Sequence, residues 1–525
     1  MYIHIAEMLA RNARMYPDEV ALIERIPTDS RRHEITWQQF DERANRFANV
    51  LTQKGVRKGA KVVHLMHNSI DWLIAYFGIV KTGAWVVPLN FRYTSEDIKY
   101  CLDVARPDVL LFGDEFTGRI DAIRDQIPVK HYICAGKEVP DYADPFSELL
   151  EDAPATAPDV MLGSDDPCGL YFTSGTTGRP KPILLTHKNM LCACITEKIH
   201  HGQTREDNFI LIPPLYHTGA KMHWFGSFIV GGRAVILKGV SPEWILEAVS
   251  EEGGTIVWLL VPWVQDILLK LDSGELKLED YRLDQWRLMH MGAMPIPRSL
   301  IERWRAYFPS MDYNTTYGLS EASGPNCMQL GIGNIHKVGS IGRPGFNWEA
   351  RIVGEDDRNV PDGDVGELIF RGNGVMREYF NNPEATADAL KDGWLHTGDM
   401  AKQDEDGFIY LVDRKKDIII TGGENVFPVE VEHFVFRHPC VKDAAAIGYP
   451  DERLGEIVAV VIELVPGKRL TEEEVLNHCR EIPRYKRPRK VFFGEIPRSP
   501  TGKIEKPKLR KKYIGRMEAL GPNIS

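Results

Sequence analysis

Short apolar runs alternate with amphipathic segments through most of the chain up to residue 412. The runs at 61–66, 84–89 and 234–237 have the length and the β-branched content of buried strands. Apolar residues at helical spacing fall between such runs, over 69–81 and 94–105. This alternation predicts an α/β fold in which largely parallel sheets and helices form layers.

The pattern changes near residue 413. A strand-like run at 407–412 is followed by five charged residues at 413–417, and further apolar residues come next. A charged stretch between two apolar strands is typical of an exposed connector between domains. The rest of the chain is long enough for a small α+β domain. We therefore predict two domains, 1–413 and 414–525.

Length, charge and cysteine usage narrow the class of protein. A chain of 525 residues exceeds what one hydrophobic core usually holds, which agrees with two or more domains. The net charge of −10 argues against nonspecific binding to nucleic acid or to membrane surfaces. The eight cysteines form no CxxC pair, and neither a signal peptide nor an 18-residue apolar stretch is evident. We expect a soluble, cytoplasmic protein without integral membrane association.

The segment 171–181, YFTSGTTGRPK, is rich in glycine and hydroxyl groups and follows an apolar run. Glycine lets backbone amides approach a polyanion closely, hydroxyl groups add donors, and lysine supplies charge. It is not a Walker A loop, because Pro182 stands where that loop needs Ser or Thr. A flexible Ser/Gly linker is the alternative. The residues predicted to hold nucleotide phosphates are Thr173, Ser174, Gly175, Thr176, Thr177, Gly178 and Lys181.

A second segment, 313–321, brings an aromatic ring, a glycine, hydroxyl groups and a carboxylate into close spacing. The ring can stack on a base, a hydroxyl can contact a phosphate, and the carboxylate can bind Mg²⁺. Ordinary strand–turn–helix junctions also contain such strings. The candidate residues are Thr316, Tyr317, Gly318, Ser320 and Glu321.

These segments resemble motifs of the adenylate-forming superfamily, which comprises acyl-CoA synthetases, adenylation domains and luciferases. The segment 171–181 resembles its phosphate loop, and 313–321 resembles its YG-x-T-E motif with Ser320 in place of threonine. Five motifs occur in the family's order over 171–506, and the acyl-CoA synthetase branch fits best. The resemblance implies a large amino-terminal domain of several layered sheets and a small carboxyl-terminal domain that rotates between two half-reactions.

Two of the remaining motifs concern the ribose of the nucleotide. The segment 394–399 resembles the family's TGD motif, whose aspartate, here Asp399, binds the ribose hydroxyls. An Asx turn that caps a strand is the alternative for this aspartate. The match also places Arg414 against the ribose and Lys416 at the hinge.

The last motif, 496–506, resembles the family's carboxyl-terminal loop and makes Lys503 the catalytic lysine. An ammonium group can pair with the carboxylate oxygen and the α-phosphate as charge redistributes. The alternative is one more exposed lysine, because the whole stretch 484–512 is basic.

The resemblance implies an AMP-forming acid–thiol ligase that uses ATP, Mg²⁺ and coenzyme A. A carboxylate attacks the α-phosphate of ATP to give an acyl-adenylate and pyrophosphate, and a thiol then displaces AMP. By the same match, Gly292 and Ala293 lie beside the adenylate, and Glu321 is the metal ligand. The implied catalytic residues are Lys503, Glu321, Ser320 and His217.

The thiol is expected to be that of coenzyme A. The Gly-Gly turn at 422–423 resembles the turn that walls the pantetheine tunnel in CoA ligases. Leu454 stands where some relatives carry an aromatic residue for the CoA adenine, which weakens the match. The residues implied for coenzyme A are Gly422, Gly423, Arg487, Arg489 and Arg92.

The acyl pocket is expected around the segment 213–219, which resembles the PMFH segment of acyl and aryl ligases. No aspartate for a substrate ammonium is present there, which argues against an amino acid substrate. Lys221 and His223 are expected on the solvent side of a helix, with a polar substrate group as the alternative partner. The candidate pocket residues are His217, Gly219, His223, Trp263 and Met294, and large residues there suit a medium-chain, alicyclic or aromatic carboxylate.

Three alternatives stay open. The chain could load a carrier-protein thiol instead of coenzyme A, although no carrier domain is evident within it. It could be a luciferase-like oxidoreductase, or a binding module without catalysis. The expected partners are small molecules (a carboxylate, ATP and CoA), and the sequence is compatible with a homodimer.

Overall fold

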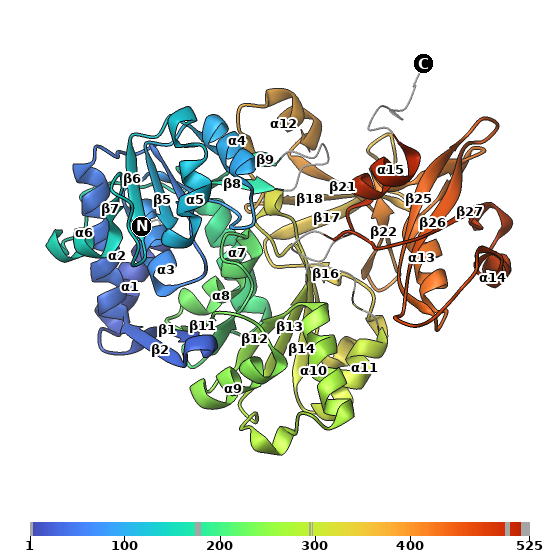
Figure 1. The fold of residues 1–525 in the computed structure, drawn as a ribbon, viewed down its shortest axis with the longest axis horizontal. Helices are drawn as coiled ribbons and strands as arrows, with labels where there is room; N and C mark the ends of the chain where they lie inside the picture. The colour runs from blue at the N-terminus through green and yellow to red at the C-terminus, as the bar shows by residue number, and fades with distance from the viewer. Residues whose placement is uncertain (1–3, 174–179, 293–295, 297, 499–503, 516–525) are drawn as a thin grey trace. The chain divides into compact units, whose positions relative to one another are not determined.

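The computed structural model describes residues 4–173, 180–292, 296, 298–498 and 504–515 (Figure 1). The chain forms two compact units. The first unit comprises Met1–Glu349 and Phe370–Leu395, and the second unit comprises Ala350–Ile369 and His396–Ser525. The predicted domains 1–413 and 414–525 and the hinge near Lys416 stay predictions.

The first sheet of the first unit has the strand order β19-β9-β8-β4-β3-β5-β6-β7. The strands from β8 to β7 run parallel, whereas β9 and β19 join antiparallel at one edge. The bounds are β3 Lys61–Leu65, β4 Trp85–Pro88, β5 Val109–Gly113, β6 His131–Ala135, β7 Asp144–Pro145, β8 Pro167–Thr173, β9 Lys181–Thr186 and β19 Glu378–Tyr379. The strands predicted at 61–66 and 84–89 are confirmed as β3 and β4.

The predicted helices begin where a hydroxyl side chain caps them. Ser69 accepts a hydrogen bond from the Trp72 amide and precedes α3 (Ile70–Lys81). Thr94 forms a reciprocal capping box with Asp97 at the start of α4 (Ser95–Ala105). Such caps satisfy amides that a helix cannot pair internally. The spacing that predicts helices over 69–81 and 94–105 is therefore confirmed.

The second sheet of the first unit has the strand order β16-β15-β14-β13-β12-β10-β11-β1-β2. Its strands from β14 to β1 run parallel, so their carboxyl ends meet at one edge. The bounds are β1 Val20–Ile26, β2 Arg31–Thr36, β10 Asn208–Leu211, β11 Arg233–Leu237, β12 Ile256–Leu259, β13 Leu288–Gly292, β14 Asp312–Tyr317, β15 Cys327–Leu330 and β16 Arg343–Pro344. The run at 234–237 is confirmed within β11.

Helices α3, α7 and α8 form the layer between these two sheets. α3 contacts β3 and β4 of the first sheet and β1 of the second, α7 contacts β9, and α8 contacts β10 and β11. α8 is buried along nearly its whole length, as a helix in a central layer must be. The longer helices are α1 Ile5–Met15, α2 Trp37–Gln53, α7 His187–His200, α8 Thr218–Phe228, α9 Pro242–Glu252, α10 Val261–Ser273 and α11 Arg298–Tyr307. Three shorter ones are α5 Thr117–Asp121, α6 Phe146–Asp152 and α12 Pro383–Ala389.

The second unit is a small α+β assembly. Its main sheet has the order β24-β23-β26-β25, and β27 pairs in parallel with β26. The bounds are β23 Ile419–Thr421, β24 Glu424–Val426, β25 Val441–Asp451, β26 Gly455–Leu464, β27 Lys490–Phe493, α13 Pro428–Phe436, α14 Glu472–His478 and α15 Lys506–Ile514. The predicted fold class is confirmed: α/β with a large amino-terminal part and a small carboxyl-terminal α+β part.

A further sheet contains the strands in which the chain passes from one unit to the other. Its order is β17-β18-β21-β20, with β22 paired to β21. The bounds are β17 Trp348–Val353, β18 Gly366–Gly372, β20 Leu390–Lys391, β21 Trp394–Gln403 and β22 Ile409–Arg414. Within the described residues, no helix combines the length and the apolar character that a membrane span requires.

Candidate active site

The predicted phosphate loop connects the antiparallel strands β8 and β9. Thr173 ends β8, Lys181 begins β9, and these two residues lie opposite each other. The Thr173 hydroxyl donates to the Lys181 carbonyl at 3.4 Å, so both ends of the loop are held together. The predicted site residues Ser174, Gly175, Thr176, Thr177, Gly178, Ala293, Met294 and Lys503 lie outside the described residues. Their roles stay predictions.

Glu321, the predicted Mg²⁺ ligand, is linked to the base of this hairpin by Tyr379. The Tyr379 hydroxyl donates to Glu321 Oε1 at 3.0 Å, and Lys181 Nζ lies 5.3 Å from the centroid of the Tyr379 ring. Tyr379 reaches this position because β19 pairs with β9. A carboxylate and an ammonium group are thus positioned by one tyrosine beside the predicted phosphate loop.

Tyr379 is a residue that the motifs do not reveal. It lies far from both the phosphate loop and Glu321 in the sequence, within a two-residue strand that shows no clear periodicity. Only the pairing of β19 with β9, where Tyr379 lies opposite Ile183, brings it to the site.

Thr316 and Gly292 lie opposite each other at the carboxyl ends of β14 and β13. A Cβ atom on Gly292 would lie 3.1 Å from Thr316 Oγ1, which is tighter than side chains normally pack. Thr316 Oγ1 is also 3.0 Å from His290 Nε2. The structure therefore brings together two of the predicted nucleotide residues and adds a buried histidine behind them.

The residues after Thr316 turn sharply. The Tyr317 ring stacks on Phe370, with centroids 5.9 Å apart and planes 26° apart. A Cβ atom on Gly318 would come within 3.0 Å of the facing backbone, so a glycine is needed here. Ser320 Oγ lies 3.3 Å from the Thr218 hydroxyl at the start of α8. This contact ties the predicted YG-x-T-E segment to the helix that carries the predicted acyl residues.

The predicted acyl residues His217, Gly219 and His223 lie at the start of α8. His217 is the residue before the helix, and Gly219 and His223 are one turn apart. A Cβ atom on Gly219 would lie 3.7 Å from His223 Nε2 and 3.8 Å from Trp258 Cη2. The tryptophan in ring contact with His223 is Trp258, at 4.6 Å between centroids, whereas Trp263 packs against the core beside the second sheet.

The expectation that Lys221 and His223 face solvent is wrong. Lys221 is 0% exposed and His223 is 5% exposed, because α8 lies inside the layered core. Lys221 Nζ donates to the His217 carbonyl at 3.2 Å and lies 4.4 Å from the Tyr171 ring centroid. Burial lowers the pKa of Lys221 well below its usual range. Lys221 therefore holds the turn that carries His217.

The two predicted ribose ligands lie in the second unit and pair with each other. Asp399 on β21 and Arg414 on β22 are opposite in the antiparallel ladder, and Arg414 Nε contacts Asp399 Oδ1. Asp399 is buried, whereas the Arg414 side chain is half-buried. Asp399, the aspartate of the predicted TGD motif, is thus held in an ion pair with Arg414.

The residues predicted to bind coenzyme A differ in their surroundings. Gly422 and Gly423 form the two-residue turn between β23 and β24, with φ of 59° and 86° that suit glycine. The Arg487 guanidinium donates to the carbonyls of Ile482 and Arg480, at 2.8 and 2.6 Å. Arg489 in the second unit and Arg92 in the first unit are exposed. The coenzyme A role of all five stays a prediction.

Comparisons with known proteins agree with these motifs. Residues 9–380 match the model of the AMP-binding enzyme family, and residues 430–503 match the AMP-binding enzyme carboxyl-terminal domain. The chain is 33% identical to the long-chain-fatty-acid–CoA ligase FadD13 of Mycobacterium tuberculosis, over 97% of this chain and 98% of that protein. It is also 33% identical to the feruloyl-CoA synthase of an Amycolatopsis species, over 96% of this chain and 98% of that protein.

A solved structure has a similar fold. The anthranilate CoA ligase AuaEII in complex with anthranoyl-AMP is 28% identical, with a TM-score of 0.86 over 97% of both chains. Both family models match, and whole-length relatives are CoA ligases. The chain belongs to the AMP-binding enzyme family, in its acid–thiol ligase branch, as its motifs predict.

Proposed function

We propose that the enzyme converts a medium-chain, alicyclic or aromatic carboxylate, ATP and coenzyme A into acyl-CoA, AMP and pyrophosphate. The observation that carries this proposal is the contact chain from Lys181 through Tyr379 to Glu321. It puts a cation and a carboxylate at the base of a hairpin whose loop is rich in glycine and hydroxyl groups. Phosphate binding needs both groups: donors and positive charge for the oxygens, and a carboxylate for the accompanying cation.

Glu321 fits a magnesium site. Its Oε1 accepts one hydrogen bond from Tyr379, which orients the carboxylate and leaves further oxygen lone pairs for a cation. Magnesium, when bound with ATP, would neutralise charge on the phosphates. Tyr379 would keep the Glu321 carboxylate in place, and Lys181 would bind a phosphate oxygen.

Two bond exchanges make up the reaction. In the first, a carboxylate oxygen of the substrate bonds to the α-phosphorus, and the bond to pyrophosphate breaks. In the second, the CoA sulfur bonds to the acyl carbon, its proton leaves, and AMP departs with the bridging oxygen. Lys503 would stabilise the charge that develops on the α-phosphate in the first step.

Separate assays of the two steps test this proposal. We expect Lys503→Ala to lower carboxylate-dependent pyrophosphate exchange by at least about a hundredfold, since it removes a cation from the transition state. Thioester formation from supplied acyl-AMP should be spared. Lys508→Ala is the matched control, because Lys508 is an exposed lysine of the same basic stretch, paired with Glu505. Equal loss of both steps in the Lys503 variant would contradict the assignment.

The carrier-protein alternative is tested by coenzyme A alone. A carboxylate-dependent thioester with coenzyme A supports the ligase, whereas acyl-AMP that persists in its presence supports a loading enzyme.

A further inference from the structure

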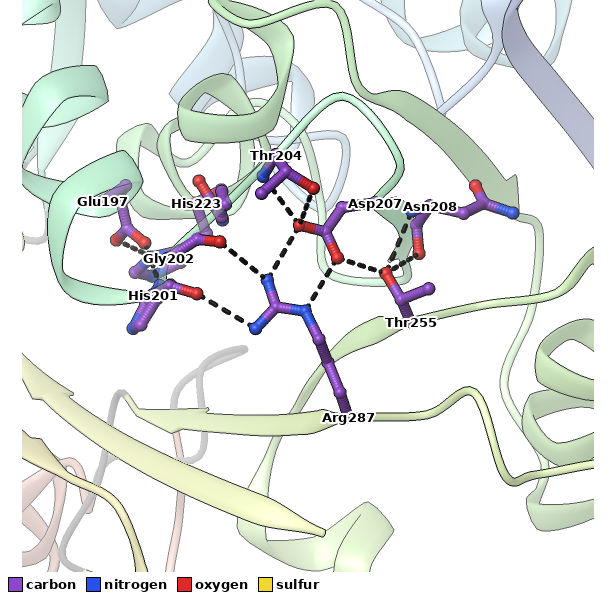
Figure 2. Close-up of polar contacts among 10 residues, drawn as sticks. Glu197, His201, Gly202, Thr204, Asp207, Asn208, His223, Thr255 and Arg287 are labelled. Atoms are coloured by element: carbon purple, nitrogen blue, oxygen red, sulfur yellow. Dashed lines mark hydrogen bonds and ion pairs between the residues drawn. The ribbon is translucent and has the colours of Figure 1, made fainter.

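Three histidine side chains gather around one glutamate inside the first unit. Glu197 lies near the end of α7 and His201 directly follows that helix, whereas His223 is on α8 and His290 is on β13. Glu197 Oε2 lies 2.6 Å from His201 Nδ1, and Oε1 contacts His223 Nδ1 (Figure 2). The His290 ring centroid lies 4.1 Å from that of His223 and 4.6 Å from that of His201. All four residues are at most 5% exposed, and we call them the acid–histidine cluster.

The spacing within the cluster suits a metal ion. One ligand atom each from Glu197, His223 and His290 lies within 4.8 Å of the others. The ligands of a tetrahedral zinc ion, at about 2.0–2.1 Å from the metal, stand about 3.3 Å apart. The distances in the cluster bracket this value, because Glu197 Oε1 and His223 Nδ1 are closer together and no pair of the three ligand atoms exceeds 4.8 Å. Small shifts of these side chains would therefore give the three ligand atoms a common centre.

His290 has a buried ring nitrogen that no described protein group uses. Its Nε2 lies 3.0 Å from Thr316 Oγ1, whereas its Nδ1 has no hydrogen-bond partner among the residues that the structure describes. A buried polar atom left unpaired costs about 1–3 kcal/mol, and such an atom in a native core points to a bound water molecule or ion. Since Thr316 engages Nε2, Nδ1 is the atom left to coordinate a cation.

A second layer of contacts holds the glutamate in position. His201 contacts Oε2 of Glu197, which leaves Oε1 for a cation. Arg287 donates two hydrogen bonds to Asp207, each at 2.8 Å, and a third to the His201 carbonyl at 3.1 Å (Figure 2). Thr255 donates to the same aspartate at 2.7 Å. Metal sites in proteins typically have such outer partners, which orient the side chains that bind the metal.

We propose that Glu197, His223 and His290 bind one divalent transition-metal ion, and that zinc is the ion this ligand set fits best. Catalytic zinc sites use the same set of two imidazoles and one carboxylate, with a fourth position for water or another ligand. Binding would release the proton that Glu197 and His223 share in their contact, and the two atoms would then move apart around the ion.

This metal site differs in its chemistry from the Mg²⁺ site predicted at Glu321. Imidazole nitrogen suits zinc, copper, nickel and iron, whereas magnesium takes oxygen ligands. The inference does not depend on the proposed ligase function, since it concerns other residues and another ion. A hydrogen-bonded cluster without a metal ion is the alternative.

Metal analysis of the wild-type enzyme is the first test. The full chain is purified without a histidine tag, because a tag would itself bind zinc, and in a buffer with excess Mg²⁺ and no chelator. Mass spectrometry of the metals should find about one zinc ion per chain, or uptake of about one added zinc ion after treatment with a chelator. Excess Mg²⁺ should not displace this ion, since two of its three ligands are nitrogen atoms.

Cobalt in place of zinc reports which side chains are the ligands. We expect Co²⁺ bound to the wild-type enzyme to show visible absorption bands of an ion with nitrogen and oxygen ligands. All eight cysteines are free and lie outside the cluster, so no thiolate-to-cobalt charge-transfer band should appear in the near ultraviolet. Such a band would place the ion at cysteines and overturn the inference. This measurement needs no variant, so it stays decisive where a substitution impairs folding.

Four variants complete the test. Glu197→Gln removes the charge of one ligand and His290→Leu removes another, so each should lower zinc affinity at least about a hundredfold in competition with a chromophoric chelator. His201→Gln alters only the contact that orients Glu197, and we expect a loss of about tenfold. The matched control is His64→Leu, at a fully buried histidine outside the cluster, which should bind zinc as the wild type does.

The opposite results would overturn the inference. One is a wild-type enzyme that neither contains nor takes up zinc, cobalt, nickel or iron; the four side chains would then form a hydrogen-bonded cluster alone. Another is a zinc affinity that stays unchanged in both Glu197→Gln and His290→Leu. Neither result bears on the ligase reaction, which carboxylate-dependent AMP release reports separately.

Discussion

Tyr379 links two charged groups that come from distant parts of the sequence. Its hydroxyl donates to Glu321 and its ring lies beside the Lys181 ammonium group. A hydrogen bond to an ionised carboxylate is worth about 1.5–3 kcal/mol, and groups that orient a metal ligand typically affect metal affinity about 10–100-fold. The orientation of Glu321 therefore depends on Tyr379.

Tyr379→Phe tests this dependence. We expect the Mg²⁺ concentration for half-maximal pyrophosphate exchange to rise about tenfold, because Glu321 loses its orienting donor. The measurement is a Mg²⁺ titration at saturating ATP and carboxylate. Tyr410→Phe is the control, since the Tyr410 hydroxyl contacts Asp404 in the second unit. An unchanged Mg²⁺ dependence in Tyr379→Phe would separate this tyrosine from the metal site.

His64 gives the first unit an acid-sensitive position. Neither of its ring nitrogens has a hydrogen-bond partner among the described residues, and its ring lies 4.5 Å from that of Trp72. Burial, together with nearby Lys221, lowers the pKa of His64 to about 3. The unfolded chain takes up this proton near pH 6.5 and the folded chain near pH 3, so stability is complete above 6.5 and falls between 6.5 and 3.

His64→Leu should therefore flatten the acid dependence of stability. Relative to wild type, we expect the variant to gain about 1.4 kcal/mol in the free energy of unfolding for each pH unit below 6.5. Urea unfolding of both proteins at pH 7.5, 6.5 and 5.5 measures this difference. The exposed His33→Leu variant should show no such gain. A difference between His64→Leu and wild type that is constant over this range would rule out His64 as a source of acid sensitivity.

At the scale of elements, α15 is anchored inside the second unit by its first residue. Lys506 Nζ lies 3.0 Å from Glu432 Oε1 on α13 and 4.0 Å from Asp413 Oδ1. Arg510, one turn further along, lies 2.9 Å from Asp417. The helix that follows the predicted catalytic loop is thus tied to the charged stretch 413–417.

Lys506→Met should loosen this anchor. Burial raises the pKa of Glu432 and of Asp413, and nearby Lys506 opposes that rise. Removing the lysine leaves buried carboxylates without a cation, which typically costs about 3–5 kcal/mol. We expect faster hydrogen–deuterium exchange in α13 and β25, and partial recovery when Glu432→Gln is added. The control is Lys508→Met, at an exposed position. Protection equal to wild type in Lys506→Met would show that the ion pairs contribute nothing.

Elements with local signals were predictable from the sequence, and contacts between distant elements were not. Ser69 and Thr94 cap their helices with short-range hydrogen bonds, so the spans of α3 and α4 follow from nearby residues. Glu197 and His201 are four residues apart and so share one side of the α7 end, but His223 and His290 join them only because α8 and β13 pack nearby. The sequence predicts Trp263 as a pocket residue, whereas Trp258 is the tryptophan that contacts His223. The reason is the same, because strand order decides which tryptophan lies beside α8.

At the scale of the whole molecule, we predict that the carboxyl-terminal part changes its orientation between the two half-reactions. We expect Lys416→Pro to reduce thioester formation more than adenylation, by about tenfold or more, because proline fixes φ and restricts the preceding residue. Single-turnover assays of each step measure the two effects. Lys415→Pro is the neighbouring control for general disruption. An unaffected second step in Lys416→Pro would remove this residue from the hinge.

The proposed reaction depends on one step, in which the enzyme activates a carboxylate as a mixed anhydride with AMP. The most direct measurement uses a substrate acid labelled with oxygen-18 in its carboxylate, together with ATP, Mg²⁺ and coenzyme A, and mass analysis of the nucleotide product. We predict AMP that carries one labelled oxygen, formed in equal amount to acyl-CoA. Unlabelled AMP, or ADP in its place, would contradict the claim.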